Sequence, residues 1–93
     1  MIHTFACRET EKIFARHYSR SFPPAIQRAA LRKLLILDAA AVLDDLKMPP
    51  GNRLVRLSGD RTGQYSIRIN RQWRICFEWH KGNCFGVEIT DYH

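Results

Sequence analysis

The sequence has no long apolar run and few cysteines, and both absences limit the class of protein. No window approaches the roughly 18 apolar residues that a membrane-spanning helix needs. The first residues do not show the basic stretch and apolar segment of an export signal. The cysteines Cys7, Cys76 and Cys84 are odd in number and lack metal-ligand spacing. We therefore expect a cytoplasmic protein with no membrane segment, no disulfide framework, no metal and no other cofactor.

Internal repeats and low-complexity tracts are also absent, so the 93 residues are expected to form one domain over residues 1–93. A hydrophobic fraction of 45% is typical of a globular protein. Fifteen Lys and Arg against nine Asp and Glu give a formal net charge of +6. This excess predicts a polyanionic partner or an acidic protein partner, and the charge alone does not distinguish the two.

Three runs of alternating apolar and polar residues lie in the second half of the chain, over residues 64–70, 73–79 and 84–90. Such alternation is typical of half-buried β-strands. An antiparallel sheet with one buried face produces it, so each predicted strand has one apolar and one polar face. The short connections between the runs favour two consecutive hairpins.

Paired strands must point equivalent side chains the same way, and this requirement sets the register. A loop of residues 81–83 would place Trp79 opposite Phe85 and Ile75 opposite Ile89. These pairs would keep the apolar side chains of both strands on one face of the sheet.

The same rule places Arg68 opposite Arg74 on the polar face of the first two strands. Like charges directly opposite each other weaken a sheet, so the pair indicates a site for an anion, most simply phosphate. A solvated face in which the two arginines point apart is the alternative.

Helical periodicity precedes the strands. Residues 2–5 alternate as a short strand, and Thr10 is a candidate N-cap for a first helix. Pro24 suits the first turn of a second helix, and residues 53–57 predict a further strand. The apolar stripe of the second helix is Ile26, Ala30, Leu34 and Leu37. Because a chain of this length offers only one apolar sheet face for the helices to cover, we expect an α+β fold. Both helices would pack on that face, and the other face would be open.

The chain contains the motif GDR-x-G-x-x-SI-x-IN-x-x-WRI-x-F-x-W and ends in DYH. These residues resemble the HigB-type plasmid maintenance killers of the RelE/ParE toxin superfamily, and the predicted elements before them are compatible with the same family. The resemblance implies a RelE-like fold, in which an N-terminal strand and two main helices cover one face of a mostly antiparallel, twisted sheet. It also implies the toxin of a type II toxin-antitoxin system, a ribosome-dependent endoribonuclease that cleaves messenger RNA and inhibits translation.

Cleavage of RNA by its own 2′-hydroxyl requires removal of that proton, stabilisation of phosphorane charge and protonation of the departing 5′-oxygen. Arg74, the arginine of the WRI motif, is predicted to stabilise the charge, because a guanidinium donates paired hydrogen bonds and keeps its proton. The alternative is that Arg74 is an exposed strand arginine with no catalytic role.

The resemblance places Tyr92 and His93 beside the scissile phosphate. His93 exchanges a proton near neutral pH, and its own α-carboxylate favours the imidazolium, which suits a general acid. Tyr92 would stack on a base or donate a hydrogen bond, and Asp91 would orient Arg74 or an imidazole. The alternative for His93 is a frayed chain end with no catalytic role, and the alternative for Tyr92 is a side chain packed in the core.

Four further arginines are predicted to bind RNA phosphates: Arg53, Arg56, Arg61 and Arg68. The chain departs from the family pattern at Val55 and Ser58, which fall where relatives have a His and a Lys. Neither side chain takes up a proton near neutral pH, so the general base stays unassigned.

The partners that the resemblance implies are a HigA-like helix-turn-helix antitoxin, the ribosome and its messenger RNA, and operator DNA reached through the antitoxin. One alternative is a ParE-like inhibitor of gyrase, which needs no acid-base pair. Another is a catalytically decayed toxin that acts only through its antitoxin. The DYH ending favours the ribonuclease.

Overall fold

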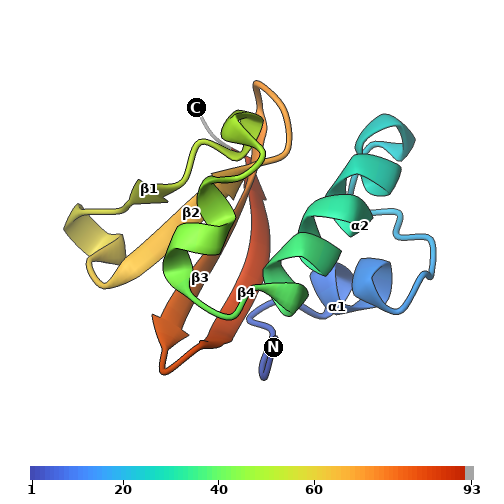
Figure 1. Cartoon of the computed structure of the whole chain (residues 1–93). Coiled ribbons are helices and arrows are strands. Elements are labelled where there is room, and N and C mark those ends of the chain that lie inside the picture. The colour runs from blue at the N-terminus through green and yellow to red at the C-terminus, as the bar shows by residue number, and fades with distance from the viewer. Residues whose placement is uncertain (92–93) are drawn as a thin grey trace.

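The computed structural model describes residues 1–91, in which two helices pack against a four-stranded antiparallel sheet (Figure 1). The helices are α1 (Arg8–Phe14) and α2 (Pro24–Ala39). The strands lie in the order β1 (Val55–Arg56), β2 (Gln64–Arg68), β3 (Trp73–His80) and β4 (Asn83–Asp91). Three short 3-10 helices connect α2 to β2, namely η1 (Leu43–Lys47), η2 (Pro50–Asn52) and η3 (Gly59–Arg61). The α+β fold expected from the sequence is confirmed.

The core lies between the helices and one face of the sheet. The stripe predicted for α2 is buried there: Ile26, Ala30, Leu34 and Leu37. It belongs to the same cluster as Ile67 of β2 and Ile75 and Phe77 of β3, which are fully buried. Strand side chains alternate between faces, so the neighbours of these residues point away from the helices. Ser66 and Arg74 are two such neighbours.

The N-terminal segment pairs with the outer edge of β4, although it forms isolated bridges instead of a continuous strand. Ile2 bridges to Cys84 and Phe5 to Val87, both in parallel orientation. The backbone N–H of Ile2 also donates to Asp38 Oδ1 of α2 at 2.9 Å. These contacts attach the N-terminus to both layers and cover an edge that would otherwise be free to pair with another chain.

Thr10 does not cap α1, because the helix begins at Arg8 and Cys7 occupies the N-cap position. Thr10 is fully buried, and its Oγ1 accepts a hydrogen bond from the backbone N–H of Ile89 at 3.0 Å. The threonine therefore accepts a backbone N–H at the edge of β4, beyond the last bridge that the N-terminal segment makes with this strand. The sequence pattern missed this role because it depends on how α1 meets the sheet.

The hairpin between β3 and β4 differs from its predicted register. Its turn has two residues, Lys81 and Gly82, with φ of 49° and 81°, and two-residue type I′ turns need positive φ at both positions. Trp79 consequently pairs with Cys84, and the predicted pairing with Phe85 was wrong. Cys84 is fully buried, which raises the pKa of its thiol to about 12 and leaves it unreactive.

A β-bulge restores the predicted register further along β4. The register shifts between Cys76 and Glu78 of β3, where two residues of β4 face one of β3. Gly86 lies at this point with φ of 61°, a conformation that glycine adopts without strain. Beyond the bulge Ile75 pairs with Ile89 as predicted.

Candidate active site

A cleft of about 200 Å³ lies on the sheet face that points away from the helices. Its lining residues are Leu57, Arg61, Ser66, Arg74, Cys76, Thr90 and Asp91. They come from β2, β3, β4 and the segment between β1 and β2. The cleft brings together three of the predicted site residues, Arg61, Arg74 and Asp91, whereas its lining does not include Arg53, Arg56 or Arg68.

Arg74 is held in one orientation by neighbouring oxygen atoms. Its side chain lines the cleft, yet the residue is only 8% exposed. Nε donates to Ser66 Oγ at 2.7 Å, and Nη2 donates to the backbone carbonyl of Arg53 at 2.8 Å. A planar guanidinium with two of its nitrogens bonded in different directions cannot rotate freely, so its donors are preorganised.

The Arg53 carbonyl reaches Arg74 because of the local backbone. Arg53 follows η2 with a left-handed φ of 46°. The preceding residue, Asn52, is fully buried, and its Nδ2 donates to the carbonyls of Leu46 and Met48 at 3.2 and 3.1 Å. Lys33 of α2 donates in turn to Asn52 Oδ1. The helix layer thus positions a carbonyl on the opposite face of the sheet.

Arg68 and Arg74 pair across β2 and β3, as the register predicted. Their head groups have different partners, however. Arg68 Nε donates to the Asn70 carbonyl at 3.0 Å, which attaches it to the hairpin loop. The two side chains are therefore separately anchored, an arrangement that lowers the repulsion expected from two like charges at this position.

Arg61 reaches the cleft from η3 and already has an acidic partner. Its Nη1 donates to Glu88 Oε1 at 2.8 Å and to Gln64 Oε1 at 3.0 Å. The hydrogen bond with Glu88 raises the pKa of Arg61 above its ordinary value. Arg61 therefore supplies hydrogen-bond donors to the cleft, but Glu88 offsets its positive charge.

Arg56 lies on the exposed surface of β1. Its guanidinium carbon is 5.6 Å from the ring centroid of Tyr65, and its Nη2 donates to the Tyr65 hydroxyl at 3.3 Å. A cation stacked on an aromatic ring remains accessible to an anion from the other side. Val55 and Ser58, the two departures from the family pattern, are both exposed nearby.

Asp91 ends β4 at the rim of the cleft. It pairs with Trp73, and its Oδ2 accepts a hydrogen bond from Gln72 Nε2 at 3.0 Å. The carboxylate is exposed and lies where the strand leads into the chain end. The other two residues of the DYH motif, Tyr92 and His93, lie outside the described residues.

Two residues that the sequence analysis did not select contribute to the cleft. Ser66 is fully buried and bonds Arg74, while Glu88 bonds Arg61. Their positions on the polar faces of the predicted strands were the available signal, because alternation puts both on the same face as Arg74.

Within residues 1–91 there is no group of three or more His, Cys, Asp or Glu side chains that could hold a metal ion. In the same part of the chain no helix is long and apolar enough to cross a membrane.

Comparisons with known proteins agree with this architecture. Residues 3–93 match the HigB-like toxin family, described as the RelE-like toxin of type II toxin-antitoxin system HigB. The chain therefore belongs to this family of RelE-like toxins. The HigB-type resemblance seen in the sequence is confirmed.

Individual relatives support the same assignment. A segment of 63 residues, 68% of the chain, is 49% identical to Toxin HigB-1 of Vibrio cholerae and covers 66% of that protein, slightly under two thirds. The chain is 27% identical to Endoribonuclease HigB of Proteus vulgaris over the full length of both proteins. It is also 33% identical over 57 residues to an uncharacterized protein of Haemophilus influenzae, of which the match covers 56%.

Proposed function

We propose that this toxin is an endoribonuclease that cleaves messenger RNA on the ribosome by attack of the RNA 2′-hydroxyl, and that it needs no metal. The observation that carries the proposal is the buried Arg74, which lines a cleft that has Asp91 at its rim. Its guanidinium donates hydrogen bonds to Ser66 Oγ and to the Arg53 carbonyl. Full-length similarity to Endoribonuclease HigB of Proteus vulgaris supports the same activity.

Arg74 would stabilise the negative charge that develops on the phosphorane oxygens. Hydrogen-bond donors that are already oriented stabilise a transition state without paying for reorganisation during the reaction. The bonds to Ser66 and to the Arg53 carbonyl hold the guanidinium in this way. A lysine would keep the charge but lose the planar arrangement of donors.

His93 would act as the general acid on the departing 5′-oxygen, and Tyr92 would stack on a base or donate a hydrogen bond beside the scissile phosphate. Asp91 would orient one of the cationic groups. The exposed arginines Arg53 and Arg56, together with Arg68, would bind phosphates along the RNA. Because Val55 and Ser58 cannot serve as bases, the proton acceptor for the 2′-hydroxyl would come from the ribosome or solvent.

The proposed partners follow from this activity. The ribosome would hold the messenger in line for attack, which lowers the entropic cost of reaching the reactive geometry. A HigA-like helix-turn-helix antitoxin would neutralise the toxin and connect it to operator DNA. The site of action would be the cytoplasm, where translation occurs.

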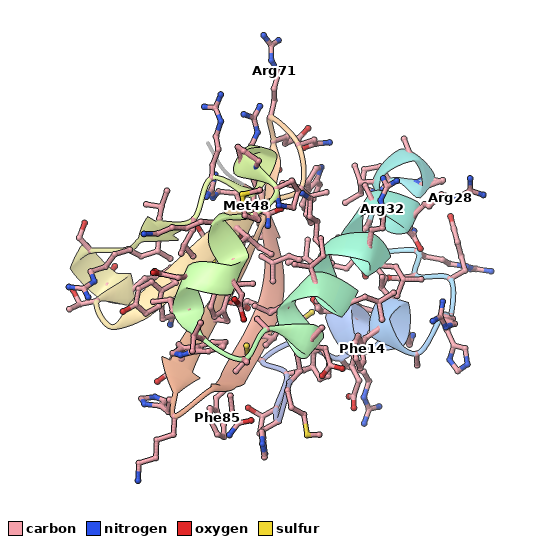
Figure 2. The ribbon with its side chains drawn as sticks, viewed as in Figure 1. Phe14, Arg28, Arg32, Met48, Arg71 and Phe85 are labelled. Atoms are coloured by element: carbon pink, nitrogen blue, oxygen red, sulfur yellow. The ribbon has the colours of Figure 1, made fainter. Side chains whose placement is uncertain are left out.

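Expression of the toxin alone, followed by mapping of RNA 5′ ends in the arrested cells, tests the proposal. We expect cuts in messengers that are phased with codons. Arg74→Ala and His93→Gln should each reduce cutting by about a hundredfold or more. The matched control is Arg71→Ala, which removes an arginine from the exposed loop between β2 and β3 (Figure 2). Intact RNA with damaged DNA would instead indicate a gyrase inhibitor, and full cutting by the Arg74→Ala variant would remove Arg74 from the mechanism.

A further inference from the structure

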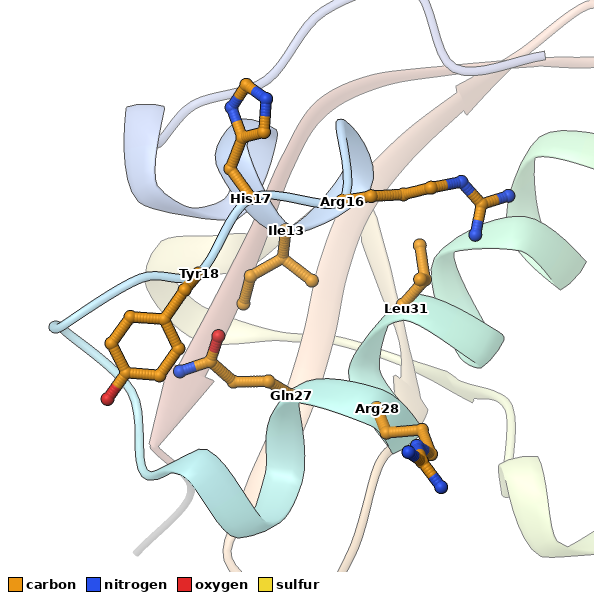
Figure 3. Close-up of a pocket in the computed structure, with 7 residues that line it drawn as sticks. All are labelled: Ile13, Arg16, His17, Tyr18, Gln27, Arg28 and Leu31. Carbon is orange, nitrogen blue, oxygen red and sulfur yellow. The ribbon is translucent and has the colours of Figure 1, made fainter.

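A second cavity, of about 280 Å³, lies between the C-terminal end of α1 and one face of α2. Its lining residues are Ile13, Arg16, His17, Tyr18, Gln27, Arg28 and Leu31. We refer to this cavity as the helix groove. In Figure 3, Ile13 points into the middle of the groove, Tyr18 and Gln27 lie at one end, and the Arg16 side chain extends beside Leu31 at the other.

The helix groove combines an apolar floor with a cationic rim. Ile13 is buried and Leu31 is half-buried, whereas Tyr18 is 64% exposed although it is a large apolar side chain. Arg16 and Arg28 are exposed, and no carboxylate within residues 1–91 forms an ion pair with either of them. Figure 2 shows Arg28 at the outer edge of the molecule beside α2. This groove therefore complements a ligand that carries both apolar groups and negative charge.

The backbone at Arg16 supplies an independent observation. Arg16 follows α1 with a left-handed φ of 67°, and its N–H donates to the Ile13 carbonyl at 2.9 Å. Glycine is the usual residue at such a helix end because a Cβ destabilises the left-handed conformation. An arginine at this position lowers stability, and strained positions of this kind cluster at functional sites.

The helix groove and the cleft around Arg74 lie on opposite sides of the sheet. The helices cover the face that holds Ile67 and Ile75, whereas Arg74 points to the other face. Figure 1 shows α1 and α2 together on one side, away from β1 and β2. A molecule seated in the groove would therefore leave the cleft accessible.

We propose that the helix groove binds an acidic segment of the antitoxin, with an apolar side chain on Ile13 and Leu31 and carboxylates on Arg16 and Arg28. This inference rests on the proposed function only in that the toxin has a protein antitoxin. The apolar floor favours a polypeptide over RNA, because RNA would match the charges but lacks the branched aliphatic side chains that pack well on Ile13 and Leu31. Occupation of this surface holds the toxin without filling the cleft.

The first test measures antitoxin binding to a charge-reversed groove. The double variant Arg16→Glu with Arg28→Glu is prepared in the Arg74→Ala background, so that cells tolerate it and binding is measured without cleavage. The probe is the antitoxin encoded beside the toxin gene, and its Kd is measured by calorimetry. We expect the Kd to rise by about a hundredfold, because like charges would face each other across the interface.

The matched control is Arg8→Glu with Arg71→Glu, an equal change of charge at two exposed arginines that do not line the groove. Its Kd should stay within about threefold of the parent because exposed charges away from an interface change affinity little. An unchanged Kd in the groove variant would overturn the inference. A groove variant that keeps Arg74 and cuts RNA less than the parent, at unchanged antitoxin affinity, would also overturn it, since the groove would then be an RNA surface. A failure of Arg74→Ala to stop cutting would concern the cleft alone.

The second test uses Arg16→Gly, which relieves the backbone strain. The melting temperature should rise by roughly 4 °C, because the left-handed conformation no longer carries a Cβ. Antitoxin affinity should fall about tenfold at the same time, since one charged contact is lost. The rise in melting temperature follows from the backbone alone, so the affinity decides: unchanged antitoxin affinity in Arg16→Gly would contradict the proposal.

Discussion

Arg74 Nε lies 2.7 Å from the Ser66 hydroxyl oxygen, and the serine that accepts this hydrogen bond is fully buried. Ser66 is one strand away from Arg74, on β2, and eight positions earlier in the chain. A small buried hydroxyl thus orients the side chain to which we assign stabilisation of the transition state. The Arg53 carbonyl completes the arrangement from a different segment.

Ser66→Ala tests this relationship. The change leaves the Nε of a nearly buried guanidinium without its acceptor, so the free energy of unfolding should fall by about 1–3 kcal/mol. Messenger cutting should fall between about tenfold and a hundredfold because Arg74 loses its fixed orientation. In the Arg74→Ala background the serine change should reduce cutting no further.

The matched control is Ser58→Ala, which removes the hydroxyl of an exposed serine that makes no side-chain cap hydrogen bond. It should alter neither stability nor cutting. An additive loss of cutting in the double variant of Ser66 and Arg74 would show that the serine acts independently of the arginine.

Glu88→Gln should strengthen RNA binding. Glu88 offsets the charge of Arg61, and both side chains are partly exposed, so loss of the ion pair should cost at most about 1 kcal/mol of stability. Without the carboxylate, the positive charge of Arg61 is no longer offset and can pair with a phosphate. The slope of log affinity against log salt concentration should then steepen by about 0.7 for a single-stranded RNA. Binding of a short RNA measured at several salt concentrations checks this. An unchanged slope would mean that Arg61 does not meet the RNA backbone.

Asp45→Asn should reduce stability in a pH-dependent manner. Asp45 Oδ2 accepts the backbone N–H groups of Ala41 and Val42 at 2.9 and 3.1 Å, and these bonds lower the pKa of the carboxyl below 3.8. A lowered pKa in the folded state means that the stabilisation is present above pH 3.8 and is lost as the pH falls further. The urea midpoint of the variant should therefore lie below that of the parent at pH 7, and the difference should disappear in acid.

Asp44→Asn is the control for Asp45, since the neighbouring carboxylate is exposed and, among residues 1–91, forms an ion pair with Lys47 alone. Its midpoint should match that of the parent at pH 7. A difference between Asp45→Asn and the parent that persists unchanged at low pH would rule out the charged hydrogen bonds as its cause.

Gly86→Ala should destabilise the fold through the backbone alone. A Cβ at this position would meet Glu78 Oε2 at 3.7 Å, which is ordinary contact, but the φ of 61° is left-handed. The expected cost is about 1–2 kcal/mol, or a fall in melting temperature of at least roughly 4 °C. Gly51→Ala is the control, because within residues 1–91 nothing beyond its chain neighbours lies within 4 Å of its added Cβ, and its φ is not positive. Equal melting temperatures for the two variants would argue against a strained bulge.

The strands could be predicted because the alternation of apolar and polar residues is visible in a few consecutive positions of the sequence. Arg68 pairs with Arg74 as the polar faces required. The β3–β4 turn could not be predicted, because Lys81 adopts a positive φ that its residue type disfavours and only the surrounding hairpin compensates. The bulge at Gly86 then restores the register, so an error at the turn left the pairing near Arg74 correct.

The order of the amino acids determined the two-layer fold, the face on which Arg74 lies and the excess of positive charge, because periodicity and composition are local properties. Folding decided which charges have partners and which groups converge. Ser66 and the Arg53 carbonyl meet Arg74, Glu88 offsets Arg61, and Arg16 and Arg28 share one groove. These relationships join residues far apart in the chain, and they depend on packing between layers that no periodic pattern encodes.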